Sequence, residues 1–359
     1  MSPRFSVPLL LLLTVISAPA LALDTAAYRA INRNAVERHI LPRYDALAAA
    51  MAGLAAESRR FCAAPSGSGL APLQQAYNTA VDAWQDIQHV RFGPIDLFFR
   101  SQRIAFWPDA RNTISKQMAE MLSQRDPDAL SAERLAKGSV AVQGLPVLER
   151  LLFGRDAERL LSGDQAVFRC QYTVAISRNL AGMAGDTAKE WRSGDPPYAL
   201  AVTDVRHSDG RYVETKDATL DLFKSLYTAV ELVADHKLAR PLGASLEQAR
   251  PRLAEAWRSE RSMRNITRNL QAAADLYRQA FAPAMTDAEL DTEIRSAFDM
   301  AGAAAQAIRL PLEAAVQDRA MRDRVEALAA QVIVLKNLLL QKLPIAIDVP
   351  VGFNALDGD

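Results

Sequence analysis

One acidic residue interrupts an apolar run of the chain, SVAVQGLPVLERLLFG at residues 139–154. At helical spacing Val142, Leu145, Glu149 and Leu152 fall on one stripe, which places the Glu149 carboxylate on a core-facing side. A buried carboxylate is costly unless it finds a hydrogen-bond donor, a counter-charge or a metal ion. The position of Glu149 therefore indicates either a structural carboxylate or a metal ligand.

Two residues just before Glu149 predict where its helix begins. Gly144 and Pro146 make one continuous helix improbable, because Pro146 cannot donate to the carbonyl of Val142 and suits the first turn of a new helix. The positive end of that helix dipole favours an anion, and an arginine from residues 90–112 is the second expected partner. The metal-ligand alternative stays open beside this structural one.

The segment VRFGPIDLFFRSQRIAFWPDARN, residues 90–112, combines arginines, aromatic side chains and two aspartates. Its candidate site residues are Arg91, Asp96, Trp107 and Asp109. Gly-Pro and Trp-Pro breaks end helices here and leave their terminal groups free to face a cleft. Two interpretations remain: an arginine–aspartate network that braces a helix junction, or a polar cleft whose carboxylates bind a cation.

The four histidines, His39, His89, His207 and His236, are scattered singly. The chain has no HExxH, CxxC or Glu-x-x-His spacing, no GxSxG and no glycine-rich phosphate loop. These absences count against a zinc hydrolase, a serine hydrolase and a nucleotide enzyme. A lone histidine is usually a surface or packing residue, but His89 precedes a helix end and is kept as a candidate ligand.

The amino terminus has the features of a secretory signal peptide over residues 1–22, with cleavage between Ala22 and Leu23. No cysteine follows the cleavage site, so no lipobox is indicated. We identify no later stretch that is apolar for 18 residues, and we expect no transmembrane segment in the mature chain. The sequence thus predicts an exported, periplasmic protein.

The charge balance and the cysteines further limit the kind of protein and the partners that we expect. The chain carries 42 basic and 42 acidic side chains, a balance that argues against nucleic acid or an anionic membrane as partner. Cys62 and Cys170 are the only cysteines, and in an oxidising compartment such a pair is more often a disulfide than two free thiols.

Apolar residues recur with a 3.6-residue period along most of the chain, which predicts an all-α fold. The one short strand candidate is IAIDV, residues 345–349. Residues 70–91 match residues 243–264 at a constant offset, and QGLPVLE is followed later by IRLPLE. We infer two tandem helical-bundle halves related by internal duplication, residues 23–192 and 217–359, joined by a linker at 193–216.

The last nine residues, VGFNALDGD, offer oxygen ligands for a hard cation. The oxygens would come from Asn354, Asp357 and Asp359, beside Gly358. The alternative is a solvated tail.

Several of these blocks together resemble the imelysin family, which is also classed as M75-like peptidases. They are AWQDIQHVRFGP, RIAFWPDAR, SVAVQGLPVLERLLFG, AEAWRSERS and GFNALDGD, in order over nearly the whole mature chain. The resemblance implies an all-helical, two-halved, exported protein associated with uptake of iron or another divalent metal, and a membrane uptake component as partner. The family signature is Gly-x-His-x-x-Glu. Gly144 and Glu149 fill its ends, but Pro146 stands at the histidine position.

We therefore expect a non-enzymatic protein that binds a metal ion or a metal-linked ligand in a cleft between the halves. The expected ligands are Glu149, His89, Asp96 and Asp109, with Arg91 orienting them. The alternatives are a metal-dependent peptidase, which the missing motif histidine disfavours, and an interaction protein whose metal site has decayed.

Overall fold

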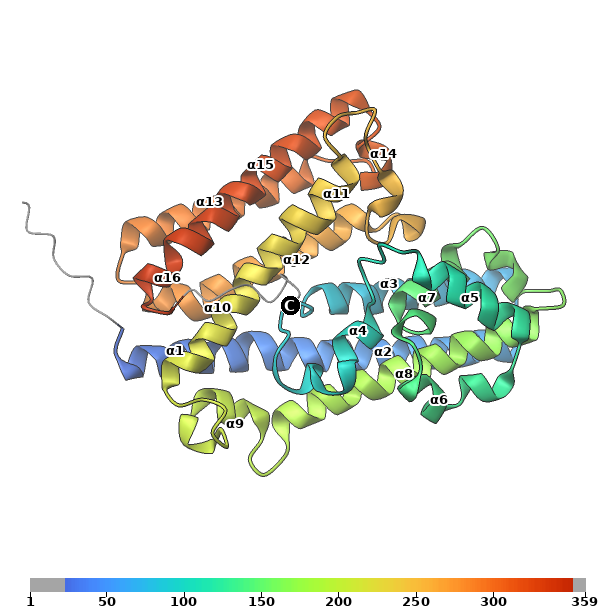
Figure 1. Ribbon diagram of the computed structural model, residues 1–359, viewed down its shortest axis with the longest axis horizontal. Coiled ribbons are helices and arrows are strands. Elements are labelled where there is room, and N and C mark those ends of the chain that lie inside the picture. Colours follow the sequence, from blue (N-terminus) through green and yellow to red (C-terminus); the bar gives the residue numbers. More distant parts are fainter. Residues whose placement is uncertain (1–22, 351–359) are drawn as a thin grey trace, which may run out of the picture.

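A computed structural model describes residues 23–350 of the chain, and every regular element in this range is helical (Figure 1). The α-helices are α1 Thr25–Asn34, α2 Leu41–Ala63, α3 Gly67–Gln85, α4 Arg100–Ile104, α5 Thr113–Gln124, α6 Ala132–Lys137, α7 Leu145–Phe153, α8 Ala166–Arg192, α9 Tyr198–Thr203, α10 Thr215–Glu231, α11 Ala239–Leu242, α12 Ser262–Leu276, α13 Ala288–Gln306, α14 Leu312–Ala315, α15 Arg319–Gln341 and α16 Leu343–Ala346. The all-α prediction is confirmed. The proposed signal peptide, Ala22 and the terminal candidates Asn354, Asp357, Gly358 and Asp359 lie outside the described residues.

Three stretches of π-helix lengthen the main helices. Residues 35–40 join α1 to α2, residues 232–238 join α10 to α11, and residues 277–281 follow α12. Such widened turns change the direction in which side chains leave a helix and are frequent at functional sites. The first of them carries His39, which is described with the site.

The long pair α2 and α8 forms the base of the amino-terminal half (Figure 1). The buried side chains of α2 include Tyr44, Leu47, Met51 and Leu54, spaced three and four apart, so one stripe of the helix faces the core. Cys62 and Cys170 join the two helices in a disulfide with Cα atoms 5.4 Å apart. The predicted disulfide is confirmed.

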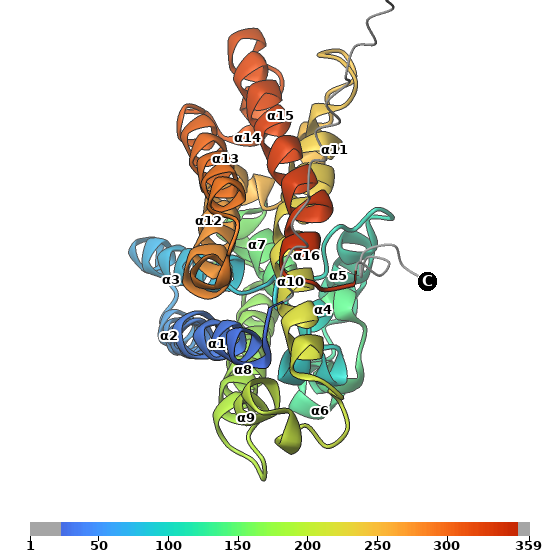
Figure 2. The same cartoon turned by 90° about the vertical axis from the view of Figure 1, so that its left-hand side faces the viewer.

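The carboxy-terminal half stands beside this base, with α13 and α15 packed against each other and α10 and α12 nearer the first half (Figure 2). Residues 319–346, which include α15 and α16, contain an 18-residue window with a mean hydropathy of 1.3, so they could cross a membrane by length and composition alone. They are a borderline exception to our expectation that no later stretch is apolar over 18 residues, and they give no clear transmembrane segment. Buried Val325, Leu328, Val332 and Leu335 show that one face of α15 packs in the core.

The strand candidate at residues 345–349 is wrong. Residues 343–346 form α16, with Pro344 in its first turn, where a proline needs no amide hydrogen. No strand occurs within residues 23–350. The alternation of apolar and polar residues in this stretch was too short to separate a strand from a helical turn.

The duplication and its halves stay a prediction. In the matched segments α3 is a continuous helix, whereas residues 243–261 are turns and short 3-10 helices before α12 begins. The second match is closer, because Glu149 in α7 and Glu313 in α14 both follow a Leu-Pro pair at a helix start. The predicted linker contains α9, so it is more ordered than its turn-forming residues indicate.

Candidate functional site

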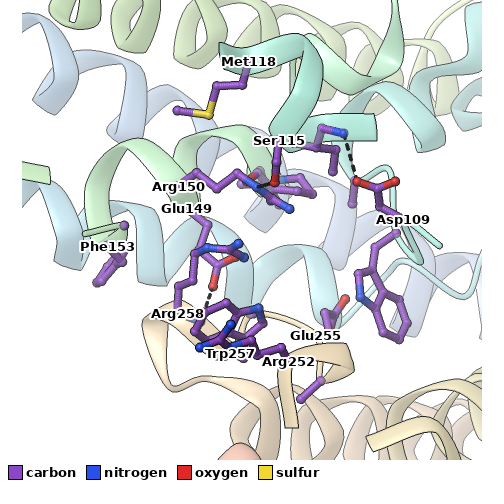
Figure 3. Close-up of a pocket in the computed structure, with 18 of the residues that line it drawn as sticks. Asp109, Ser115, Met118, Glu149, Arg150, Phe153, Arg252, Glu255, Trp257 and Arg258 are labelled. Carbon is purple, nitrogen blue, oxygen red and sulfur yellow. Dashed lines mark hydrogen bonds between the residues drawn. The ribbon is translucent and has the colours of Figure 1, made fainter. Parts of the chain in front are cut away.

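A large cavity lies where the two halves meet, and we call it the junction cavity. It encloses about 950 Å³. Its walls are α3, α5, α7 and residues 105–112 from the first half, and residues 252–260 with Asn265 and Glu313 from the second. Figure 3 shows the stretch of this wall around Glu149. The volume lies within the range of small-molecule sites.

The first turn of α7 is built as the sequence predicts. The helix begins at Leu145 with Gly144 as N-cap and Pro146 in its first turn. Gly144 has a φ of 86°, and a Cβ there would lie 2.5 Å from the Arg103 carbonyl oxygen and 2.6 Å from that of Ile104. Only glycine allows this close approach. The contact fixes the direction in which α7 enters the cavity wall.

Glu149 is 4% exposed and accepts hydrogen bonds from the second half of the molecule. One carboxylate oxygen, Oε1, accepts the backbone amides of Arg258 and Ser259 at 3.0 and 3.1 Å, and the Ser259 hydroxyl at 3.1 Å. Burial raises the pKa of Glu149, while Arg258 and the Ser259 amide act in the opposite direction. The structural interpretation of Glu149 thus finds its partners, but at residues 258 and 259 rather than in the segment 90–112.

The loop that holds Glu149 also presents an arginine to the cavity. The short 3-10 helix Trp257–Ser259 lies between Ala256 and Glu260, which have φ values of 53° and 56°. Left-handed backbone at non-glycine residues is unfavourable and tends to occur at functional sites. The Arg258 guanidinium stacks 4.3 Å from the centre of the Trp257 ring. Glu149 thereby positions an Arg–Trp stack through the backbone of the loop.

Arg150, the next residue of α7, reaches the same part of the cavity (Figure 3). Its Nη1 donates to the Pro146 carbonyl at 2.7 Å and its Nε to the Ser115 hydroxyl at 3.4 Å. Among residues 23–350, neither Arg150 nor Arg258 has a carboxylate oxygen within 4 Å in an ion pair. Burial lowers the pKa of both guanidiniums, but arginine remains protonated at neutral pH.

Several acidic groups of the cavity already have partners. Asp109 lines the cavity but accepts the amides of Thr113 and Ile114 at 2.8 and 2.9 Å, so it caps α5. Glu255 accepts from the Lys237 ammonium at 2.6 Å and from the Asn265 amide at 2.8 Å. These two carboxylates serve the local structure. The guanidiniums of Arg150 and Arg258 remain without a carboxylate partner in the described chain, and Glu260 and Glu313 also line the cavity.

His89 pairs with another histidine inside the first half. Its Nε2 lies 2.9 Å from the Nε2 of His39, and both rings are buried. Neither Nδ1 has a hydrogen-bond partner in the described part of the chain. Burial lowers the pKa of both rings, that of His89 to about 3, so the pair is neutral at pH 7. His89 is not among the residues that line the junction cavity.

The structure does not bring the predicted metal ligands together. Glu149 and Asp109 line the cavity with Trp107, whereas His89 and Asp96 do not. Asp96 and Arg91 are exposed residues on either side of the Gly-Pro turn. Within residues 23–350 no group of three or more His, Cys, Asp or Glu residues could hold a metal ion. The donor set therefore does not fit a bare transition-metal ion.

Sequence reasoning missed the residues 252–260 that the second half contributes to the site, and it did not single out Trp84 of α3. Trp84 and Trp257 both line the cavity, and each lies in one of the two segments that match in sequence. The useful signal was the two Ala-Trp pairs, which mark the segments that face each other across the junction. No pattern in the sequence indicates that the amides of residues 258 and 259 bind Glu149.

Comparisons with known proteins agree with this fold. The sequence profile described as Imelysin, Peptidase_M75, matches residues 40–339. Iron-regulated protein A of Synechococcus elongatus is 23% identical over 245 residues, which cover 68% of this chain and 62% of that protein. The chain thus spans less than two thirds of the length of this curated relative.

Two solved structures are similar over almost the whole chain. An imelysin-like protein from Psychrobacter arcticum has a TM-score of 0.77 and 21% identity, and the match covers 93% of this chain and 100% of that one. A putative iron-regulated protein A precursor from Parabacteroides distasonis has a TM-score of 0.75 and 18% identity, covering 91% and 96%.

Proposed function

The chain belongs to the imelysin family, and from this premise we propose that it binds iron as a small chelate in the junction cavity and catalyses no reaction. The proposal rests on which of the charged side chains around Glu149 already have a partner in the protein. The carboxylate is occupied by two backbone amides. In the part of the chain that the structure describes, the neighbouring guanidiniums of Arg150 and Arg258 form no ion pair with a carboxylate. A metal ion that is already coordinated by a chelator needs no ligands from the protein.

The choice of iron as the metal is supported by two relatives. One is named an iron-regulated protein A, and the other a precursor of such a protein. That the second relative is described as a precursor supports export, as does the predicted signal peptide of this chain. We extend the proposal to a periplasmic location and to a membrane uptake component that receives the ligand.

A metal-dependent peptidase is less well supported by the residues. The family signature requires a histidine where this chain has Pro146 in the first turn of α7. Oε1 of Glu149 accepts three hydrogen bonds. A role as general base would require these hydrogen bonds to break.

The test measures iron retained by the purified protein after gel filtration. One set of samples receives Fe²⁺, Fe³⁺ or Zn²⁺ salts, and the other receives the ferric complexes of citrate or of a trihydroxamate. We expect iron at about one equivalent only from a chelate, because the cavity lacks a ligand set for the bare ion. The retained iron is measured by elemental analysis.

The variant Glu149→Gln separates the alternatives. Stoichiometric Fe²⁺ or Zn²⁺ retained by the wild-type protein and lost in Glu149→Gln would contradict the proposal and establish a direct metal site. Zinc-dependent cleavage of unfolded casein that disappears in the same variant would establish the peptidase. Retention of neither chelate would end the proposal.

A further inference from the structure

We infer that the junction cavity selects a hydroxycarboxylate: a ligand whose carboxylates bind Arg150 and Arg258 and whose other oxygens reach Trp84 and Asn265. This inference rests on the proposed function, because it names the chemical class of the ligand in the same cavity. Two features of the cavity wall support it among residues 23–350: two guanidiniums without a carboxylate partner, and two buried polar atoms without a hydrogen bond.

The arginine end of the cavity is built to recognise planar oxyanions. A guanidinium offers several N–H donors in a fixed plane, which matches two oxygens of a carboxylate. Arg258 lies on one side of the Trp257 ring at 4.3 Å, and Arg252 lies at 5.7 Å from the same ring. Stacking restricts these side chains before a ligand binds, so less rotamer entropy is lost on binding. Arg150 is restrained by its bond to the Pro146 carbonyl.

Two buried polar atoms mark a second end of the cavity. Trp84 is 3% exposed and lines the cavity, and its Nε1–H has no acceptor in the described chain. Asn265 is fully buried and also lines the cavity; its Nδ2 donates to Glu255, while its Oδ1 has no donor. A buried donor or acceptor without a partner destabilises the folded protein. A ligand with an acceptor for Trp84 and a hydroxyl for Asn265 would give both atoms a partner.

The volume of the junction cavity sets an upper limit on the size of the ligand. About 950 Å³ accommodates one small hydroxycarboxylate or a complex of more than one small chelator.

Two carboxylates of the cavity wall, those of Glu313 and Glu260, repel an anionic ligand. Glu313 accepts a long hydrogen bond from the Ser262 hydroxyl, at 3.4 Å. Burial raises the pKa of Glu313, hydrogen bonds from its own backbone amide and from Ser262 act in the opposite direction, and the exposed Glu260 adds to the increase. Their charges favour placing the carboxylates of the ligand towards Arg150 and Arg258 and its uncharged part towards Glu313.

Isothermal titration calorimetry on the full mature chain tests the inference. The probes are citrate, tricarballylate, ferric citrate and a neutral ferric trihydroxamate. Tricarballylate is citrate without its hydroxyl group, so it isolates the contribution expected from Asn265. The variants are Arg258→Met and Trp84→Phe, which keep apolar bulk but remove the donors. Arg134→Met removes an exposed arginine from α6 and serves as the charge-matched control.

We expect ferric citrate and citrate to bind, with tricarballylate weaker than citrate. Arg258→Met should weaken both citrate ligands at least tenfold, Trp84→Phe about threefold, and Arg134→Met neither. Binding of the trihydroxamate complex as tight as ferric citrate, and unchanged by Arg258→Met, would overturn the inference while the proposed function stands. Failure of citrate and ferric citrate to bind would also overturn it. Binding of citrate without preference for its iron complex would keep the inference and remove the proposed function.

Discussion

Glu149 and the His39–His89 pair show two ways to bury a titratable side chain. Glu149 finds the amides of Arg258 and Ser259, which stabilise its charged form against the cost of burial. Among residues 23–350 the two histidine rings hydrogen-bond only to each other, and the nearby Arg43 adds positive charge. The first arrangement tolerates a charge in the interior, and the second requires neutrality.

The histidine pair predicts a loss of stability in mild acid. The pKa of each ring is lower in the folded state than the unfolded value of 6.5, and that of His89 is about 3. Below pH 6.5 the unfolded chain therefore takes up protons that the folded protein excludes. The free energy of unfolding should fall by up to about 1.4 kcal/mol per pH unit for each histidine, and for His89 this continues to about pH 3.

Urea denaturation at pH 7 and pH 5 measures this effect. The double variant His39→Gln/His89→Gln should lose less stability between the two pH values than the wild-type protein. His207→Gln, at a partly exposed site, is the matched control and should behave like the wild type. An equal pH dependence in the double variant and the wild type would refute the assignment.

At the scale of elements, the start of α7 depends both on the local sequence and on a tertiary contact. Gly144 and Pro146 predict the break and the new helix from their own backbone preferences. The reason for glycine is tertiary, because the carbonyls of Arg103 and Ile104 occupy the place of a Cβ. The helix start is thus predictable, and its close contact with α4 is not.

Gly144→Ala should destabilise the protein by about 2–4 kcal/mol, since it adds strain at a positive φ to a clash with backbone atoms. Thermal unfolding followed by circular dichroism measures the change. Gly182→Ala in α8 is the control, because a Cβ there meets no atom within 4 Å and alanine favours the helix. A melting temperature unchanged in Gly144→Ala would show that α4 and α7 can separate at little cost.

At the scale of the whole molecule, charged side chains join α3 of the first half to α12 of the second. Asp82 accepts from Arg261 and, at 2.7 Å, from Arg264, while Arg268 pairs with Asp86. Between them the Asn269 amide donates to the Gln85 carbonyl at 2.7 Å. These contacts hold the wall of the junction cavity that carries Trp84 against the one that carries Asn265.

Asp82→Asn should lower the free energy of unfolding by about 3 kcal/mol, because Arg261 is 7% exposed and would lose its charged partner. Chemical denaturation measures the change. Glu133→Gln breaks the exposed pair with Lys137 and should change stability by less than about 1 kcal/mol. Equal effects of the two substitutions would contradict the structural role of the α3–α12 pairs.

The sequence by itself determined what depends on neighbours along the chain. The apolar period indicated the all-helical class, the Gly-x-Pro spacing located the start of α7, and a pair of cysteines indicated the disulfide. Each of these follows from backbone preference, periodicity or simple counting, which are local properties.

Only the tertiary structure decided which groups distant in the sequence contact one another. It gave Glu149 the amides of residues 258 and 259, and it paired His89 with His39. Contacts between residues 50 to 110 positions apart arise from how helices pack, and many sequences with the same apolar period pack differently. For that reason the sequence identified Glu149 as unusual, while its partners and the free arginines beside it became visible only in the folded chain.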